Sequence, residues 1–313
     1  MDRRALGPQA GRQGGRRMAE RPVVGFVGVG LMGHGMAKNA VEKGFPLRVV
    51  AHRRREAVDD LVGRGAVERP SLAAMAREVD VVVLCVTGSP EVEAALGAIV
   101  PEARPGLTVI DSSTSDPEVT ARLGASLAER RVTLIDAPLS RTPSHAWDGE
   151  LTTYVGGPKA VAEAWRELFE TWASVVIFVD APVGSAHALK LVNNLVSIGY
   201  AAIWSECYAM VRKIGADPAV FREIVSNSGM NCGNFQAFSK YAVEGDPEAH
   251  KFTLANCFKD LSYYQRMATR ARAATPMSDG TLQTLKLGLS MGMGERYISE
   301  MTDVVLRLNG DKS

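Results

Sequence analysis

Four polar side chains recur in an apolar stretch at a spacing that puts them on one helical face. Residues 186–214 are expected to form one long helix, and Lys190, Asn193, Asn194 and Ser197 stand in it at i, i+3, i+4 and i+7. An ammonium, two amides and a hydroxyl are costly to bury without partners, and a lysine ammonium can donate a proton or stabilise developing negative charge. The row therefore indicates a ligand site; a solvated helix face is the alternative.

A second constellation, near the start of the chain, has the spacing of a phosphate-binding turn. An apolar run over residues 23–28 ends in Gly28, Gly30 and Gly33, and a helical pattern follows over 31–43. A strand, a glycine turn and a helix in this order aim backbone N–H groups at a pyrophosphate. The spacing predicts dinucleotide binding; the alternative is an incidental glycine turn.

The end of the second expected strand discriminates between the two dinucleotides. NAD-binding domains carry an acidic residue there, which binds the ribose 2′-hydroxyl. This chain reads Ala51-His52-Arg53-Arg54-Arg55 instead. Guanidinium groups bind a 2′-phosphate bidentately, whereas a carboxylate would repel it. The sequence therefore predicts NADP(H) in preference to NAD(H); the alternative is that the arginines begin a solvated helix.

Apolar runs and helical patterns alternate up to about residue 179, and only helical patterns follow Gly184. The alternation predicts βαβ units and a mostly parallel sheet. We expect an α/β Rossmann-type dinucleotide-binding domain over 21–182 and an all-α C-terminal domain over 183–313. Residues 136–150, rich in Pro, Ser, Thr and Gly, are expected to be a long functional loop. The expected strands are 23–28, 47–51, 79–86, 107–111, 132–136, 152–155 and 175–179.

In the helical half, the sequence predicts one helix start and the inward-facing residues of the long helix. Asp217 and Pro218 predict the start of a helix, with an N-cap and a proline at the first helical position. On the long helix that precedes it, Leu189, Val192 and Val196 are expected to pack inward.

Composition narrows the range of partners. The 36 Lys and Arg residues balance 35 Asp and Glu, so nothing favours nucleic acid or a membrane surface. No stretch approaches the roughly 18 apolar residues of a membrane span. The four cysteines are scattered without metal-ligand spacing, which predicts reduced thiols, no metal site and a cytoplasmic location. The first 17 residues contain five arginines and no apolar run; we expect residues 1–20 to be a disordered extension, with Met18 as an alternative start, rather than a mitochondrial transit segment.

Five stretches, in order, resemble the β-hydroxyacid dehydrogenase family, which is related to 3-hydroxyisobutyrate dehydrogenase. The similarity covers residues 22 to about 300. It implies an NAD(P)-dependent oxidoreductase of small anionic hydroxyacids or semialdehydes, assembled as a homodimer or homotetramer. The matching stretches are residues 28–39 (G-x-G-x-M-G-x-x-M-A-x-N), 111–114 (D-x-S-T), 136–140 (D-A-P-L-S, where the family has D-A-P-V-S), 184–194 (G-x-x-x-x-x-K-x-x-N-N) and 259–261 (K-D-L).

The resemblance also implies roles for single residues. Lys190 would be the catalytic general acid and base, and Asn194 would bind the substrate beside it. Ser140 would bind the substrate carboxylate, Lys259 would lie near nicotinamide and substrate, and Thr114 near the nicotinamide ribose. The expected cofactor contacts are Gly28, Gly30, Leu31, Met32, Gly33, His52, Arg53, Arg54, Thr114 and Lys259.

The chain departs from the family in the substrate loop. Where the common loop continues S-G-G, this chain has Ser140, Arg141 and Thr142. An arginine adds a positive fork suited to carboxylate or sulfonate oxygens. The loop is similar to that of sulfolactaldehyde reductases, in which the equivalents of Arg141, Asn193 and Ser197 bind the sulfonate. Those reductases favour NADH, so the resemblance is partial. The alternative for the arginine is a structural bond that holds the loop.

We therefore expect an NADP(H)-dependent enzyme that interconverts a short β-hydroxyacid and its semialdehyde. Sulfolactaldehyde or succinic semialdehyde reduction is the enzymatic alternative, and a non-catalytic NADP-binding partner or sensor protein is the alternative from another class. Alcohol oxidation needs a neutral lysine, so we expect reduction near neutral pH and oxidation that rises with pH. Imine reductases share this architecture but typically lack the lysine at position 190.

Overall fold

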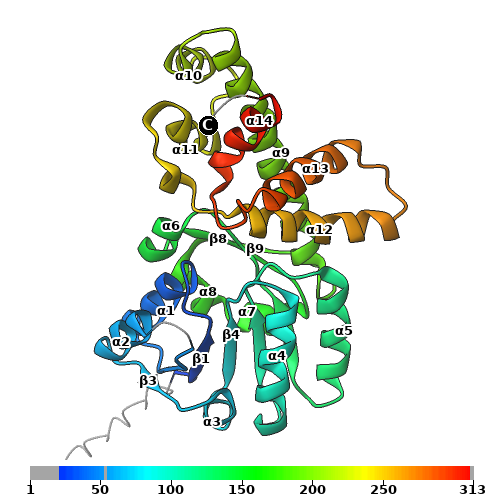
Figure 1. Cartoon of the computed structure of the whole chain (residues 1–313). Helices are drawn as coiled ribbons and strands as arrows, with labels where there is room; N and C mark the ends of the chain where they lie inside the picture. Colours follow the sequence, from blue (N-terminus) through cyan, green and yellow to red (C-terminus); the bar gives the residue numbers. More distant parts are fainter. Residues whose placement is uncertain (1–20, 53–54, 311–313) are drawn as a thin grey trace, which may run out of the picture.

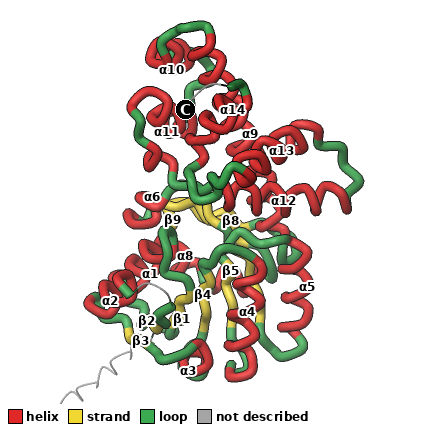
Figure 2. The backbone as a smooth tube through the Cα atoms, in the orientation of Figure 1, coloured by secondary structure: helices red, strands yellow, loops and turns green. Residues whose placement is uncertain are grey.

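The computed structural model describes residues 21–52 and 55–310. The expectations for residues 1–20 and for Arg53 and Arg54 lie outside the described residues. The chain forms one part built on β-sheets and one part built of helices, joined near Gly184 (Figures 1 and 2). Among the helices of the described ranges, none combines the length and the apolar character needed to cross a membrane.

The main sheet has six parallel strands, which in chain order are β1 (Val24–Val27), β2 (Leu47–Val49), β3 (Val67–Glu68), β4 (Val81–Leu84), β5 (Thr108–Asp111) and β6 (Thr133–Asp136). Their order in the sheet is β3-β2-β1-β4-β5-β6. All four residues of β4 are buried, as expected of a central parallel strand covered on both faces. Successive strands are added on one side of β1 up to β3 and on its other side from β4 onward, so the direction of the chain across the sheet switches between β1 and β4. In sheets of this kind, ligands bind at the carboxyl ends of the strands beside this switch point.

Helices cover both faces of this sheet. The apolar side chains of α1 (Gly33–Glu42), α2 (Glu56–Gly63) and α8 (Arg166–Trp172) pack in one core cluster. Those of α3 (Leu72–Ala76), α4 (Ser89–Ile99) and α5 (Pro117–Ala128) pack in another. The shorter elements are η1 (Val100–Glu102) and α7 (Lys159–Ala164). The expected doubly wound α/β architecture is confirmed.

A second, three-stranded sheet follows, built of β7 (Leu139–Ser140), β8 (Leu151–Val155) and β9 (Ala173–Phe178). β7 runs antiparallel to β8, and β8 runs parallel to β9. All seven expected strands are present, with ends that differ by a few residues. The two unexpected strands, β3 and β7, have two residues each, too few for a periodic pattern to appear.

The expectation that residues 136–150 form a long loop is wrong, because they contain β7 and a short helix, α6 (Pro143–Asp148). The side chain of Asn39 on α1 fastens this helix by donating to the carbonyl oxygens of Ala146 and Trp147, at 2.9 and 3.1 Å. Gly35 allows the close approach, since a Cβ there would lie 2.5 Å from the Ala146 carbonyl carbon. Tertiary contacts with α1 therefore order a segment whose composition suggested a loop.

The C-terminal part consists of α9 (Ser185–Lys213), α10 (Pro218–Ser226), α11 (Gly233–Glu244), η2 (Pro247–His250), α12 (Leu254–Arg270), α13 (Pro276–Ser290), η3 (Ile298–Glu300) and α14 (Met301–Leu308). Asp217 caps α10 by accepting a hydrogen bond from the Ala219 N–H, as predicted. Within residues 55–310 no strand follows β9. The core of this part contains buried Trp204, Tyr208 and Phe238. α9 is its long central helix (Figure 1).

One prediction for α9 is wrong. Leu189, Val192 and Val196 do not pack inward: between 45% and 53% of each side chain is exposed. Leu191 and Ile198 lie on the buried side of the helix instead. The apolar character of α9 extends around more of its circumference than the core can cover, so the pattern by itself could not identify the inner side.

Candidate active site

The glycine turn after β1 has the shape of a phosphate cradle. Gly28 has φ +91°, and a Cβ there would lie 2.3 Å from the carbonyl oxygen of the residue that follows β4. A Cβ on Gly33 would lie 2.0 Å from the Gly28 carbonyl oxygen, whereas one on Gly30 would meet nothing within 4 Å. Leu31 is exposed and Met32 occupies the N-cap position of α1. Two glycines are thus required by close backbone approach, and the open face at Gly30 fits a dinucleotide pyrophosphate.

The other expected cofactor residues follow the carboxyl ends of neighbouring strands. His52 follows β2 and is exposed, and Arg53 and Arg54 lie outside the described residues. Thr114 follows β5, and its carbonyl oxygen accepts a 2.9 Å hydrogen bond from the Lys259 ammonium. The structure therefore brings Thr114 and Lys259 together, and it places His52 at the same edge of the sheet.

A buried carboxylate joins an expected substrate-binding residue on α9 to an expected cofactor-binding residue on α12. Asp260 on α12 is 3% exposed and accepts a 2.7 Å hydrogen bond from Asn194 Nδ2 on α9. Its other oxygen lies 2.9 Å from the ammonium of Lys259. Lys259 also donates to the carbonyl oxygens of Thr87 and Thr114, in the loops after β4 and β5. Asp260 was not predicted as a site residue, although the K-D-L match contained it.

Lys190 lies within the electrostatic reach of this network. Burial lowers the pKa of its ammonium to about 8, with the Lys259 charge acting in the same direction and the Asp260 carboxylate opposing it. A lysine with a pKa near neutrality can both donate and accept a proton at physiological pH. This is the property that a general acid and base in a reversible carbonyl reduction requires.

The remaining polar residues of the α9 row have different surroundings. Asn194 is buried against Asp260, whereas Asn193 is exposed. Ser197 accepts a 3.1 Å hydrogen bond from Asn234 Nδ2 on α11. The four residues at i, i+3, i+4 and i+7 therefore do not share one environment, because α11 and α12 cover different parts of the same helix face.

The expected substrate loop adjoins the start of α9. Asp136, at the end of β6, accepts a 2.9 Å hydrogen bond from the N–H of His187, one turn before Lys190. The Ser140 hydroxyl lies 2.7 Å from the Tyr154 hydroxyl on β8. Thr142 is hydrogen-bonded to residues of α6 rather than to α9.

Arg141 has an unusual backbone conformation for a side chain of its size, with φ +85°. Glycine adopts this left-handed region readily and other residues at a cost, so the position is one that a glycine would suit. The exposed guanidinium donates to the Glu150 carbonyl oxygen at 3.0 Å, which is the loop-holding contact named above as the alternative. A guanidinium has five N–H donors, so this bond leaves others for an anion.

His187 is a second residue that sequence reasoning missed. Its buried imidazole Nδ1 lies 2.9 Å from the Thr120 hydroxyl on α5, and its Nε2 lies 3.9 Å from an Asp111 carboxylate oxygen at the end of β5. These contacts and the backbone bond to Asp136 fasten the first turn of α9 to the carboxyl ends of β5 and β6. The only available signal was its place three residues before Lys190.

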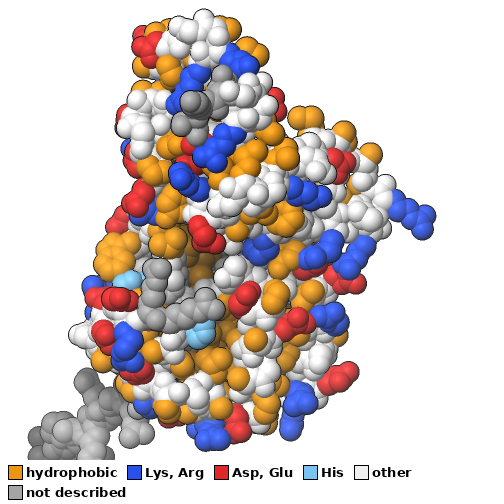
Figure 3. Space-filling view, in the orientation of Figure 1, with side chains coloured by type: hydrophobic (Ala, Val, Ile, Leu, Met, Phe, Trp, Pro, Cys, Tyr) orange, Lys and Arg blue, Asp and Glu red, His pale blue; other side chains and the backbone are white. Residues whose placement is uncertain are grey.

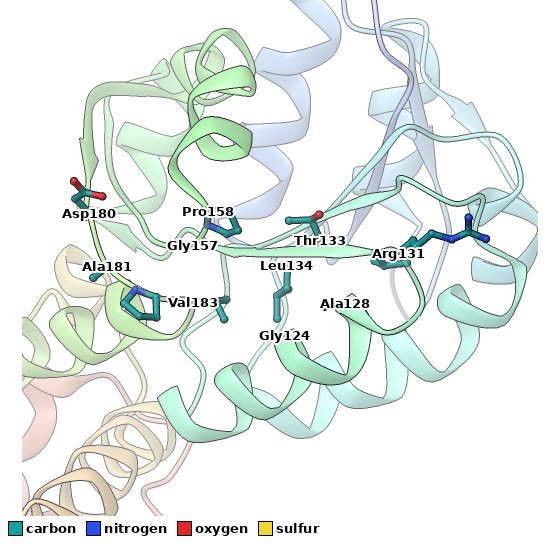
Figure 4. Close-up of a pocket in the computed structure, with 12 residues that line it drawn as sticks. Gly124, Ala128, Arg131, Thr133, Leu134, Gly157, Pro158, Asp180, Ala181 and Val183 are labelled. Atoms are coloured by element: carbon teal, nitrogen blue, oxygen red, sulfur yellow. The ribbon is translucent and has the colours of Figure 1, made fainter.

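The surface is hollowed where the helical part meets the sheet part (Figure 3). A separate cavity of about 710 Å³ lies beside β6, between α5 and the segment that leads to α9. Figure 4 shows Arg131 and Asp180 at its two ends, with Leu134 and Gly157 between them. Its lining contains none of the expected site residues, so the candidate site is defined by the network around Asp260 and not by this cavity.

Comparison with known proteins identifies the family of both parts of the chain. Residues 23–180 match the family model of the NAD-binding domain of 6-phosphogluconate dehydrogenase. Residues 184–305 match the model described as NAD-binding of NADP-dependent 3-hydroxyisobutyrate dehydrogenase. The two models together cover both parts of the fold.

Relatives extend over nearly the whole chain. Mitochondrial 3-hydroxyisobutyrate dehydrogenase of Bos taurus is 28% identical over 295 residues, covering 91% of this chain and 87% of that protein. The structure of 3-hydroxyisobutyrate dehydrogenase from Salmonella typhimurium has the same fold, with a TM-score of 0.83 at 24% identity over 90% of this chain and 99% of that one. Psf3 in complex with NADP+ and 2-OPP gives a TM-score of 0.80 at 26% identity, over 90% and 100%. The chain therefore belongs to the β-hydroxyacid dehydrogenase family and is an NAD(P)-dependent oxidoreductase that acts on hydroxyl groups.

Proposed function

We propose that the protein interconverts a short β-hydroxyacid and its semialdehyde with NADP(H), and that Lys190 is the general acid and base. The observation that carries this proposal is the Asn194–Asp260–Lys259 network beside Lys190, where burial also lowers the pKa of the lysine to about 8. Such a shift needs burial and a specific charge arrangement, which occur together most often at functional sites.

NADP(H), when bound, supplies or accepts the hydride. The residues of this chain manage the proton and the charge. In reduction, the Lys190 ammonium donates a proton to the substrate oxygen as negative charge develops there, and in oxidation the neutral amine removes it. Asn194, held by its hydrogen bond to Asp260 one turn after Lys190, would bind the substrate beside that lysine. Lys259 adds a fixed positive charge between the two parts of the fold.

Three observations support the preference for NADP(H). The segment after β2 carries His52, Arg53 and Arg54 in place of an acidic residue. One family model is described by an NADP-dependent enzyme, and a similar structure was solved with NADP+. The test is the ratio of kcat/KM for NADPH to that for NADH: a value well above one is expected, and a value below one would end this assignment.

We assign the anionic head group of the substrate to Ser140, Arg141, Thr142, Asn193 and Ser197. The arginine supports this assignment because its unused N–H donors lie in the loop that adjoins α9. Arg141→Gly is the test variant, since glycine suits the φ of this position and removes the guanidinium, with its bond to the Glu150 carbonyl, without straining the backbone. We expect KM to rise about tenfold or more for carboxylate, sulfonate or phosphonate aldehydes, the cost of a lost charged hydrogen bond, with no change for a neutral aldehyde. Equal effects on all of them would show that the arginine only holds the loop.

We further propose that residues 183–313 form the substrate and oligomerisation domain of a cytoplasmic homodimer or homotetramer. The support is the exposed apolar row of α9, which includes Leu189, Val192, Val196 and Ile203. Exposed apolar surface of this extent marks an interface more often than solvent-facing surface. Val196→Glu should dissociate the assembly in light scattering; a parent chain that is monomeric at micromolar concentration would contradict the proposal.

A substrate screen tests the function as a whole. NADPH consumption is followed with a panel of semialdehydes that carry carboxylate, sulfonate or no charged head group. Turnover of an anionic semialdehyde is the expected result. Binding of NADPH without turnover of any member would favour the non-catalytic sensor instead.

A further inference from the structure

One face of α12 places an aromatic ring between two cations. The Lys259 ammonium lies 5.2 Å from the centre of the Tyr263 ring, and the Arg266 guanidinium carbon lies 4.7 Å from it. Both distances are within the roughly 6 Å over which a ring attracts a cation. Tyr263 is 6% exposed and the Lys259 side chain 20%, so the attraction between these two acts in a partly dehydrated setting where it is stronger, whereas about half of the Arg266 side chain is exposed.

Arg266, one of the two cations beside the Tyr263 ring, is anchored in the sheet part of the molecule. Arg266 Nε donates to a carboxylate oxygen of Asp116 at 3.0 Å. Asp116 is buried, its carboxylate caps α5 by accepting from the Glu118 N–H, and its own backbone N–H donates to Ser89 Oγ. Arg266 therefore has a fixed partner in the loop after β5, and it holds one face of Tyr263 in place.

The Tyr263 hydroxyl and the Lys259 side chain face the loop after β4. A Cβ on Gly88 would lie 2.8 Å from the Tyr263 hydroxyl oxygen and 3.2 Å from Lys259 Cδ. A larger residue at this position would have to displace both side chains. The loop and α12 meet at the junction of the two parts of the fold (Figure 1), where Lys259 donates to the carbonyl oxygens of Thr87 and Thr114.

We propose that Tyr263 is a positioning residue for the reaction at Lys190: its ring holds the Lys259 ammonium at the loops after β4 and β5. The proposal rests on the proposed function. The charged groups that face Lys190 are Asp260 and Lys259. Without the ring, the Lys259 ammonium can move away from the loops after β4 and β5. Lys190 then loses a positive neighbour, and the Asp260 carboxylate, no longer paired with Lys259, attracts the Lys190 ammonium more strongly. Both changes favour the charged form of Lys190.

Competitive labelling tests this without any turnover. The full-length protein is treated with trace acetic anhydride over a range of pH, and peptide mass spectrometry follows the reactivity of Lys190 and Lys259. Tyr263→Phe keeps the ring and should titrate like the parent. Tyr263→Leu should move the titration of Lys190 to higher pH by about half to one unit, the size expected of one nearby charge in a half-buried site. The reactivity of Lys259 should also rise as it loses its place.

Two further variants keep the result interpretable. Tyr264→Leu removes a neighbouring ring that packs on the helical core instead, and it should leave both lysines unchanged. Tyr263→Met replaces the leucine variant if that chain does not fold. Titration of Lys190 in the leucine or methionine variant identical to that of the parent overturns the proposal. Absence of turnover in the parent enzyme would instead overturn the proposed function. The labelling result would be unaffected, because labelling does not require turnover.

Discussion

The two halves of the candidate site are built on different principles. The cofactor turn is constrained by its own backbone and by the end of the adjacent strand: a Cβ on Gly33 would lie 2.0 Å from the Gly28 carbonyl oxygen, and a Cβ on Gly28 would lie 2.3 Å from the carbonyl oxygen of Cys85, directly after β4. The proposed catalytic side draws on residues far apart: Asn194 and Asp260 are separated by 66 positions. Lys259 bonds to loops 145 and 172 positions away.

This difference shows which kind of site tolerates change. The turn fails when its own backbone or the adjacent strand end is strained, even if the helical part of the chain is intact. A site assembled from α9, α12 and the loops after β4 and β5 fails when any partner moves, even if each element folds well. Substitutions in the turn and in the assembled network should therefore differ in whether folding stability or turnover is lost.

Loss of Lys190 should have the largest effect. In Lys190→Met the proton donor is removed while the apolar stem remains, and kcat should fall by about 10²–10⁴. NADPH binding, measured by fluorescence titration, should stay within about twofold of the parent, because the cofactor turn is untouched. Lys286→Met, on α13, is the matched surface control. A variant with near-normal turnover would remove Lys190 from its catalytic role.

Two glycines of the cofactor turn should respond differently to the same substitution. In Gly33→Ala the new Cβ collides with the Gly28 carbonyl oxygen. The expected cost is about 1–3 kcal/mol, or a Tm lower by about 2–4 °C for each kcal/mol. In Gly30→Ala nothing in the protein lies within 4 Å of the Cβ, so Tm should be unchanged and only NADPH affinity should fall. Equal Tm losses in the two variants would contradict the reading of Gly30 as the open face.

The pH dependence should follow the protonation of Lys190, whose pKa is about 8. Reduction uses the ammonium, so its kcat should decline as pH rises through about 8, by about tenfold for each unit above it. Oxidation uses the neutral amine and should rise through the same range. Steady-state profiles measured in both directions test this. Profiles in the two directions that turn at widely different pH values would place the proton on another group.

Asp260→Asn should give the smallest and most specific change. The carboxylate raises the pKa of Lys190, so its removal should move the oxidation profile to lower pH, by about half a unit. This shift is opposite in sign to the one expected for Tyr263→Leu. The side-chain amide can still accept from Asn194, which limits the loss of kcat. Asp279→Asn, on α13, is the control, and a shift to higher pH would show that the sign of the coupling is wrong.

Sequence reasoning predicted the features that depend on neighbouring residues. The glycine spacing predicted the turn after β1, the Asp217–Pro218 pair predicted the start of α10, and alternating patterns predicted the parallel sheet. The motif matches located Lys190, Asn194 and Lys259 on the helices where the structure has them. Local backbone rules operate over a few residues, so a single stretch of sequence carries them.

The tertiary structure decided what depends on packing between distant segments. It made α6 a helix on α1 within an expected loop, and it turned Leu189, Val192 and Val196 outward on a helix whose apolar residues surround it. It brought Asp260 of α12 against Asn194 of α9, and it fastened the start of α9 to β6 through the backbone of His187. The pKa of Lys190 belongs to the same class, because burial and the charges of α12 set it. The sequence by itself determined the family, the turn and the identity of the lysine, whereas the protonation state of that lysine arises only when the two parts of the fold meet.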